Sequence, residues 1–139
     1  MKYVLDVNVA LKWVLNEVDS PKARRLRDDW RSQVHELITP DVFPFEAAYA
    51  LTRAERRKLI TDAAQFWGEI MADCPRLLPS LPLAQRALAI SRQERVGFYD
   101  CLYVALAERE GCELITADTG MVTALKPRFP FIIDLVSLP

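Results

Sequence analysis

The sequence contains few of the residues from which disulfide frameworks, zinc sites and nucleophilic centres are usually built. Its 139 residues include three cysteines, an odd number with no Cys-x-x-Cys pair, so neither a disulfide framework nor a thiolate zinc site is indicated. His35 is the only histidine, so a Cys–His or Ser–His nucleophilic system would have to use it. Nothing in the sequence places His35 near Cys101, and we expect it at the surface or at a strand edge.

An excess of charge and a long apolar run are missing as well. The 18 lysines and arginines against 19 aspartates and glutamates give a net charge of −1, which argues against a protein that holds nucleic acid by bulk positive charge. No run of about 18 uncharged apolar residues is present to span a membrane. The first residues also lack the apolar core of a signal peptide. We therefore expect a reduced, cytoplasmic protein with no membrane association.

The composition is that of an ordinary globular protein. Hydrophobic residues make up 51% and charged residues 27% of the chain, far from the composition of disordered proteins. A chain of this length buries enough surface for a core without metals or disulfides. No repeat, low-complexity tract or linker is visible, so we expect a single domain over residues 1–139.

Short apolar runs alternate with segments of helical periodicity along the whole chain. This alternation predicts an α/β three-layer sandwich with a five-stranded, mostly parallel sheet flanked by helices. We expect Asn8 and Ser20 to cap the first two helices, and residues Gly97 and Gly111 to follow helices in the left-handed conformation. The strands are expected at residues 3–5, 37–39, 77–78, 114–116 and 131–133. The third helix is expected to present one apolar face through Val42, Phe45, Ala48, Tyr49 and Thr52.

Four acids stand in apolar surroundings. Asp6 ends the first strand and Asp118 lies two residues past the fourth, at the carboxyl ends of strands where parallel sheets bind ligands. Asp100 lies in an otherwise uncharged stretch at the start of a helix, and Glu46 lies in a stretch from Val42 to Leu51 that has no other charge. Taken singly, each has an ordinary explanation: Asp118 caps a helix, for example, and Asp100 faces the positive end of a helix dipole.

Taken together, the four acids predict a cation site. Carboxylates that converge without basic partners repel one another unless cations enter, and sets of oxygen ligands suit Mg²⁺ or Mn²⁺ rather than zinc. Such a site supports metal-assisted hydrolysis of phosphodiesters.

The motifs around these acids resemble those of PIN-domain endoribonucleases, and more narrowly of the VapC toxins of bacterial toxin–antitoxin pairs. The resemblance covers nearly the whole chain. Its most specific parts are the helix that contains Asp100 and the strand that leads to Asp118. The segments that carry it are Asp6-Val7-Asn8, Phe45-Glu46-Ala47-Ala48-Tyr49-Ala50-Leu51, Phe98-Tyr99-Asp100-Cys101-Leu102-Tyr103-Val104-Ala105-Leu106-Ala107 and Leu114-Ile115-Thr116-Ala117-Asp118.

The resemblance implies a metal-dependent endoribonuclease that acts on structured RNA, such as tRNA or rRNA, and leaves a 5′-phosphate and a 3′-hydroxyl. It implies that Mg²⁺ or Mn²⁺ is held by the catalytic residues Asp6, Glu46, Asp100 and Asp118, with Asn8 and Thr116 as polar groups that orient them. It also implies a homodimer and a cognate VapB-like antitoxin. The sequence departs from the family at Val7, commonly a small hydroxyl residue, and at Thr119-Gly120, where some relatives carry another acid.

Basic residues are the next candidates for contact with RNA. Arg53, Arg56, Arg57 and Lys58 end the third helix, about two turns after Glu46 along the same helix. Arginine suits phosphate because its planar fork forms paired hydrogen bonds. This group is the best candidate in the sequence for contact with RNA phosphates, and a solvated helix end is the plainer alternative.

Three other functions can be weighed against this interpretation. A haloacid-dehalogenase-like phosphatase also begins with an acid after its first strand, but it needs a second Asp two residues later, where this sequence has Asn8. A receiver domain needs an acceptor Asp after the third strand, where Pro79 and Ser80 stand. A catalytically silent PIN-fold binding module is the non-enzymatic alternative, and the presence of all four acids argues against it.

Overall fold

The structure is a computed structural model that describes residues 1–139 as a five-stranded parallel sheet with helices on both faces. It confirms the predicted α/β three-layer architecture, and every neighbouring pair of strands is parallel. The strands are Lys2–Leu5 (β1), Glu36–Pro40 (β2), Arg76–Leu78 (β3), Glu113–Thr116 (β4) and Ile132–Asp134 (β5).

Seven α-helices and two short 3₁₀ helices connect or follow the strands. The α-helices are Val7–Val14 (α1), Ser20–Arg31 (α2), Phe43–Arg56 (α3), Ala63–Ala72 (α4), Ala84–Glu94 (α5), Phe98–Glu110 (α6) and Thr119–Leu125 (α7), and the 3₁₀ helices are Leu81–Leu83 (η1) and Leu135–Ser137 (η2).

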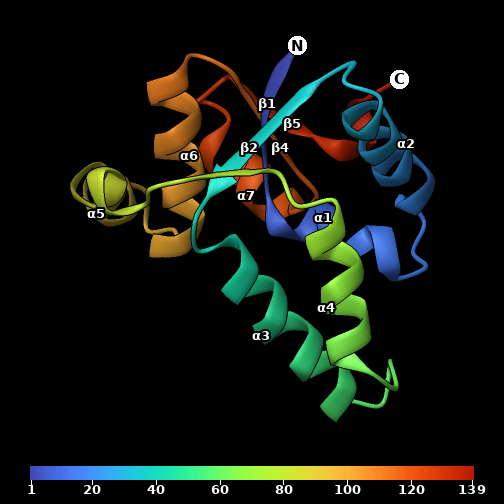
Figure 1. The fold of residues 1–139 in the computed structure, drawn as a ribbon. Coiled ribbons are helices and arrows are strands. Elements are labelled where there is room, and N and C mark those ends of the chain that lie inside the picture. Colours follow the sequence, from blue (N-terminus) through green and yellow to red (C-terminus); the bar gives the residue numbers. More distant parts are fainter.

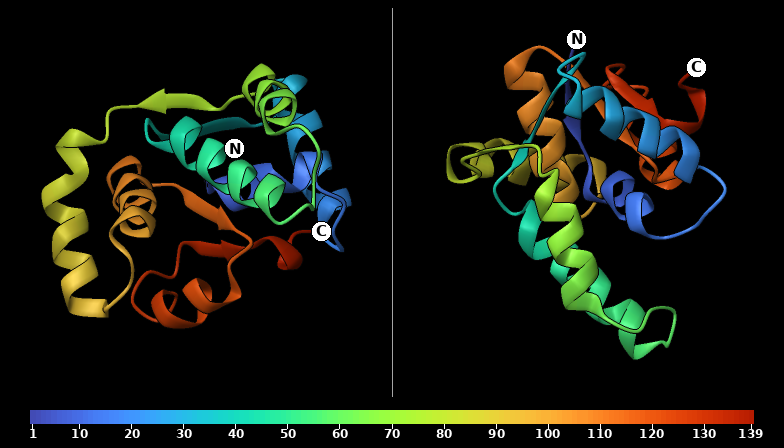
Figure 2. Two further views of the ribbon diagram at one scale, coloured as in Figure 1. Left: turned by 90° about the horizontal axis from the view of Figure 1, so that it is seen from below. Right: turned by 45° about the vertical axis from the view of Figure 1, so that its right-hand side comes forward.

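The strand order is β3-β2-β1-β4-β5, so the chain leaves the central strand in one direction and later returns to its other side. This order creates a switch point between β1 and β4, at whose carboxyl edge ligands bind in open parallel sheets. Figure 1 shows α6, with α5 outside it, on one side of the sheet and α2 on the other. Figure 2 shows the same layers from below and from the side.

The core extends from α6 through the sheet to α1 and α2 on its other face. Val4 and Leu5 of β1 are fully buried, as are Leu114 and Ile115 of β4. From Cys101 to Ala107 every residue of α6 is buried, which is why the helix shows no amphipathic pattern. A helix this deeply buried is rigid, so it can fix the position of polar groups at its first turn.

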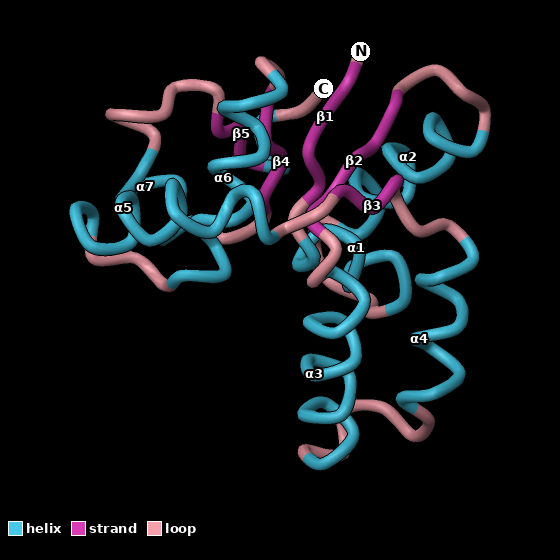
Figure 3. Tube along the Cα trace, turned by 60° about the vertical axis from the view of Figure 1, so that its left-hand side comes forward, coloured by secondary structure: helices cyan, strands magenta, loops and turns pink.

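Helices α3 and α4 form a hairpin that projects from the body beyond the carboxyl ends of the strands (Figure 3). Asp62 caps α4, since its side chain accepts a hydrogen bond from the Gln65 amide. The Trp67 indole donates to the Pro44 carbonyl across the hairpin at 2.9 Å. The hairpin therefore extends the edge of the sheet where Asp6 and Asp118 lie.

The two predicted helix caps, Asn8 and Ser20, are wrong, because neither residue lies at the N-cap of its helix. Helix α1 begins at Val7 with Asp6 as its N-cap, because the Asn8 side chain is engaged in bonds to other residues. Helix α2 already includes Ser20, whose hydroxyl donates to the Leu15 carbonyl and accepts from the Glu17 amide.

One of the two predicted left-handed glycines is also wrong. Gly111 follows α6 with φ of 62°, as expected, but Gly97 has φ of −55° and begins α6. The left-handed residue after α5 is Arg95, with φ of 58°. The left-handed residue therefore lies two positions before Gly97, the residue predicted for it.

The predicted apolar face of the third helix is wrong as well. The buried residues of α3 are Phe43, Ala47 and Leu51, which recur every four positions. Phe45 and Tyr49 are 75% and 62% exposed. The helix therefore carries two rows of apolar residues, and only the row of Phe43, Ala47 and Leu51 is buried.

No helix is long and apolar enough to cross a membrane.

Candidate metal and RNA site

Four different elements bring the predicted acids to the carboxyl edge of the sheet. Asp6 follows β1 and begins α1, and Asp118 follows β4 and begins α7. Glu46 lies in the first turn of α3 and Asp100 in the first turn of α6. Since β1 and β4 are neighbours in the sheet, Asp6 and Asp118 flank the switch point as predicted.

Asp6 is held by a network of polar groups. Its carboxylate is 2% exposed, and its Oδ2 accepts from the Thr116 hydroxyl at 2.9 Å and from Asn8 Nδ2 at 3.3 Å. Asn8 also bonds to Thr116, with its Nδ2 donating to Oγ1 at 3.2 Å. The Ala117 amide donates to Asn8 Oδ1 at 2.9 Å, so Asn8 links the ends of β1 and β4. Asn8 and Thr116 therefore both contact Asp6, one of the acids that the resemblance implies they orient.

Glu46 has one hydrogen-bond partner in the chain, Tyr103 of α6. The Tyr103 hydroxyl donates to Glu46 Oε1 at 2.7 Å, and the tyrosine ring is buried. This bond joins the projecting α3 to the rigid α6. Sequence analysis missed Tyr103, although it lies three residues after Asp100 and therefore on the same helix face.

Asp118 is the exposed acid of the site, whereas Asp100 is half-buried, as Glu46 is. Asp118 Oδ1 accepts from the Met121 amide at 3.1 Å, so the residue does cap α7 as its ordinary explanation requires. Asp118 also receives a backbone restraint, because its amide donates to Thr116 Oγ1 at 3.1 Å. Asp100 is half-buried, with no ion-pair partner. Both carboxylates therefore keep oxygen atoms free for a ligand.

The carboxylates raise one another's pKa. Burial, followed by the charges of Asp100 and Glu46, raises the pKa of Asp6 to about 7 against the opposing hydrogen bond from Thr116. Burial also raises the pKa of Glu46, opposed by the bond from Tyr103, and burial with the charge of Asp118 raises the pKa of Asp100. These couplings connect all four acids in one electrostatic cluster.

No basic side chain neutralises this cluster. None of the ion pairs in the chain involves any of the four acids. Oxygen donors with uncompensated negative charge suit Mg²⁺ or Mn²⁺. As arranged, no three acidic, histidine or cysteine side chains lie close enough to surround one metal ion. Mg²⁺ is commonly held by one or two carboxylates with several waters, so the donor set fits a hydrated ion and not an all-protein cage.

The basic residues predicted to face RNA lie at the far end of α3. Arg53, Arg56, Arg57 and Lys58 are all exposed, and the three arginines line a hollow of about 370 Å³ together with Tyr49. The Arg53 guanidinium lies over the Tyr49 ring, 5.7 Å from its centroid. The structure brings these residues together with one another but not with the four acids.

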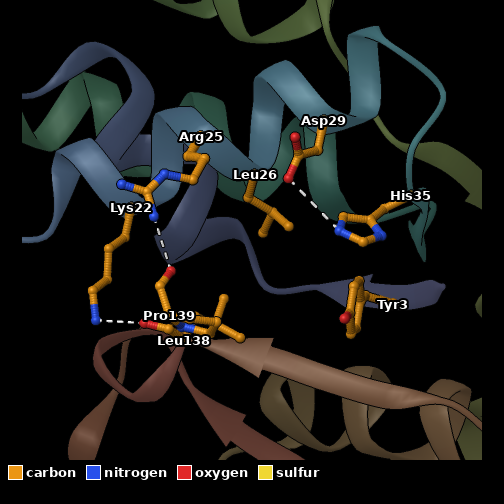
Figure 4. Close-up of a pocket in the computed structure, with 8 residues that line it drawn as sticks. All are labelled: Tyr3, Lys22, Arg25, Leu26, Asp29, His35, Leu138 and Pro139. Atoms are coloured by element: carbon orange, nitrogen blue, oxygen red, sulfur yellow. Dashed lines mark hydrogen bonds and ion pairs between the residues drawn. The ribbon is translucent and has the colours of Figure 1, made fainter.

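His35 lies in a different hollow, at the opposite ends of the strands (Figure 4). Its Nε2 lies 3.6 Å from Asp29 Oδ2, and its ring meets Tyr3 edge-on at 5.2 Å. Lys22 and Arg25 of α2 donate to the carbonyls of Leu138 and Pro139 beside it. This hollow has no part in the acid cluster.

Comparison with known proteins gives the family. The family model that describes the PIN domain matches residues 3–124. The chain belongs to the PIN domain family. Ribonuclease VapC3 from Pyrobaculum aerophilum is 31% identical over 137 residues, which cover 96% of this chain and 98% of the relative. The match to the PIN domain contains all four acids together with Asn8, Thr116 and Tyr103.

Solved structures confirm the PIN fold. PAE2754 from Pyrobaculum aerophilum superposes with a TM-score of 0.72 at 21% identity, over 99% of this chain and 85% of that one. A toxin–antitoxin complex from Klebsiella pneumoniae gives a TM-score of 0.66 at 14% identity, over 96% of this chain and 97% of that one. At these identities the likeness establishes the shared architecture of this PIN domain.

Proposed function

We propose that this PIN domain is a metal-dependent endoribonuclease of the VapC type. The observation that carries the proposal is the acid cluster of Asp6, Glu46, Asp100 and Asp118, which lies at the switch-point edge with no basic partner. The relative named Ribonuclease VapC3 supports the same activity. Structured RNA, such as tRNA or rRNA, is the substrate class that the family resemblance favours.

Mg²⁺ or Mn²⁺ held by these four acids would lower the pKa of a water molecule and stabilise charge on the scissile phosphate. The chain's own residues hold the acids in place for this. Thr116 and Asn8 fix the carboxylate of Asp6, and Tyr103 fixes that of Glu46. The hydrogen bonds to Asp6 and Glu46 favour the ionised carboxylates that a cation requires.

The phosphatase alternative loses support at Asn8. A haloacid-dehalogenase-like enzyme needs an acid at this position to move a proton. Here the Asn8 amide is bound on both sides, by Asp6 and Thr116 through its nitrogen and by the Ala117 amide through its oxygen. Asn8 therefore acts as a structural link between two strand ends.

RNA cleavage with and without divalent metal tests the proposal. We expect the purified chain to cut total RNA in Mn²⁺ or Mg²⁺, to stop in EDTA, and to leave 5′-phosphate ends on mapping. Asp6→Asn and Asp118→Asn should abolish the cutting. Cutting that survives both substitutions, or that continues in EDTA, would contradict the proposal.

We further infer that the protein is a toxin with a cognate VapB-like antitoxin and that it forms a homodimer. Leu81 and Leu88, near and on α5, are 86% and 60% exposed, and such apolar side chains fit an interface between copies. Expression should arrest growth, and co-expression of a neighbouring small open reading frame should relieve the arrest. Light scattering should give twice the mass of the 15.9 kDa chain.

A further inference from the structure

Three exposed aromatic rings surround a hollow directly beside the acid cluster. Phe45, Tyr49 and Tyr99 are 75%, 62% and 56% exposed. The hollow measures about 480 Å³, and six of its seven lining residues are apolar. The seventh is Glu46, so the hollow opens onto the proposed metal site.

Tyr49 also lines the neighbouring hollow, whose other lining residues are the three arginines of α3. Positions 45, 49, 53 and 57 lie on one stripe of the helix, because they recur every four residues. This stripe therefore passes from aromatic rings near Glu46 to guanidinium groups at the helix end. The distance from Glu46 to Arg57 along the helix is about 16 Å.

The arginines of the stripe are available for a ligand. None of Arg53, Arg56 and Arg57 forms an ion pair within the chain. The nearby Glu55 carboxylate is instead used by the Ala63 amide, which donates to it at 2.7 Å. The Arg53 guanidinium lies over the ring of Tyr49 at a cation–π distance of 5.7 Å from its centroid.

We propose that this aromatic and arginine stripe binds single-stranded RNA, with one unpaired base stacked on Tyr49 and the flanking phosphates on Arg53, Arg56 and Arg57. The inference rests on the proposed ribonuclease function and names the part of the substrate that the site holds: an unpaired segment, such as a loop of a structured RNA. Proteins read such segments by stacking splayed bases on aromatic rings and arginine planes.

Charge complementarity favours RNA over an apolar protein segment as the occupant. A purely apolar ligand would fill the hollow beside Glu46 but would leave the adjoining arginines without a partner. A nucleotide strand provides a planar apolar base and an anionic backbone side by side, which matches the order of groups along the stripe. Stacking of a base on an aromatic ring contributes about 1–3 kcal/mol, or about 5- to 150-fold in affinity.

The test measures RNA binding in EDTA, where cleavage is absent, so that binding and activity are read separately. The probe is an RNA hairpin whose loop carries one 2-aminopurine, a base whose fluorescence falls when it stacks. We expect Tyr49→Ala to weaken binding by about tenfold and to abolish the quenching, while Tyr49→Phe keeps both. Val18→Ala, which removes an exposed apolar side chain between α1 and α2, is the control and should bind as the wild type does.

A second measurement in Mn²⁺ separates this proposal from the ribonuclease activity. For Tyr49→Ala we expect KM for the hairpin to rise about tenfold with kcat nearly unchanged, because the variant loses binding and not chemistry. Wild-type cleavage together with an unchanged KM and unchanged quenching in Tyr49→Ala would overturn the stacking proposal and leave the activity standing. Loss of antitoxin binding in Tyr49→Ala, with RNA binding intact, would overturn it in favour of a protein occupant.

Discussion

Asp6 is the residue whose chemistry is most altered by the fold. A carboxyl group with a pKa raised to about 7 holds its proton more tightly in the folded than in the unfolded chain. The stability that this adds is complete below the unfolded pKa of 3.8 and is lost as the pH rises through about 7. At alkaline pH the metal-free protein is therefore destabilised by the buried, ionised carboxylate of Asp6.

We predict that the chelated protein is less stable at about pH 8 than at about pH 5, by up to about 2.6 kcal/mol. Asp6→Asn should remove most of this slope, because the amide does not ionise. Urea unfolding at a series of pH values measures it. Asp62→Asn, at a helix cap outside the site, is the control and should keep the wild-type slope. A stability that rises between these pH values would contradict the assignment of the raised pKa to Asp6.

Tyr103 is the residue that ties Glu46 to the body. Tyr103→Phe keeps the ring volume and removes only the hydroxyl that donates to Glu46. We expect kcat/KM for RNA to fall about tenfold and half-maximal activation to need more Mn²⁺, since partners of ligating carboxylates typically contribute this much. Tyr3→Phe, at the opposite strand ends, should behave as wild type. An unchanged Mn²⁺ activation curve in Tyr103→Phe would contradict a positioning role.

At the residue scale the sequence predicted the acids but not all of their neighbours. Asp6, Asp100 and Asp118 stand out because they follow strands or begin a helix without nearby basic residues. Asn8 was predicted as a cap, since asparagine favours that position, but its partners Thr116 and Ala117 lie more than a hundred positions away. Tyr103 was missed because nothing local separates a core tyrosine from one that reaches a carboxylate.

At the scale of elements, the sequence rules for helix ends disagree with the fold after α5. Arg95 adopts the left-handed conformation after α5, where a side chain costs about 1–2 kcal/mol and glycine costs little. Gly97, which the sequence suggested for this position, begins the next helix instead. The short connection between α5 and α6 leaves only these residues for the turn.

Two substitutions at helix ends test this account. Arg95→Gly should stabilise the protein by about 0.5–1 kcal/mol, because relief of the strained φ outweighs the added freedom of the unfolded chain. Gly111→Ala, at the equivalent position after α6, should destabilise it by about 1 kcal/mol. Both values come from denaturant midpoints. The two changes in the free energy of unfolding should have opposite signs. Stabilisation by Gly111→Ala would contradict the left-handed conformation of Gly111.

Helix α3 shows why amphipathic patterns can mislead. Its sequence carries two apolar stripes, and propensity alone cannot say which one packs. The stripe of Phe43, Ala47 and Leu51 is buried because the α3–α4 hairpin meets the body on that side only. The other stripe, with Phe45 and Tyr49, is exposed next to the acid cluster, where it can serve a ligand.

For the whole molecule, the near-zero net charge is the sum of two unlike regions. Once the four clustered acids are set aside, 18 basic residues face 15 acidic ones, so the remainder carries +3. The acids gather at the sheet edge and the arginines of α3 extend beyond it. This separation provides a negative centre for cations beside a positive arm for phosphates, which the total charge conceals.

A divalent cation should therefore stabilise the folded chain. We predict that Mn²⁺ at about a hundred times its dissociation constant adds about 2.7 kcal/mol and raises Tm by about 5 °C or more. EDTA should reverse the shift. Asp118→Asn should shrink it, whereas Asp62→Asn, at the cap of α4 outside the cluster, should leave it intact. A Tm that does not respond to Mn²⁺ would argue against a cation site.

The architecture was the most predictable property of all. Alternation of short apolar runs with helical periodicity is a pattern summed over the whole chain, so errors at single caps do not alter it. Right-handed crossovers limit how parallel strands can be connected, but the order that sets β1 beside β4, with Asp6 and Asp118 at one edge, is seen only in the structure. The projection of the α3–α4 hairpin was not predictable, because it depends on packing between distant segments.

The cleavage rates of four charge-neutral variants test the central claim most directly, that the four acids form one catalytic centre. Asp6→Asn, Glu46→Gln, Asp100→Asn and Asp118→Asn each remove one charge and keep the side-chain shape, and Asp62→Asn does the same at a helix cap outside the site. Rates are measured on one RNA in Mn²⁺. We predict that each of the four falls about a hundredfold or more and that Asp62→Asn stays near wild type. Near-wild-type cleavage by any one of the four variants would contradict the claim.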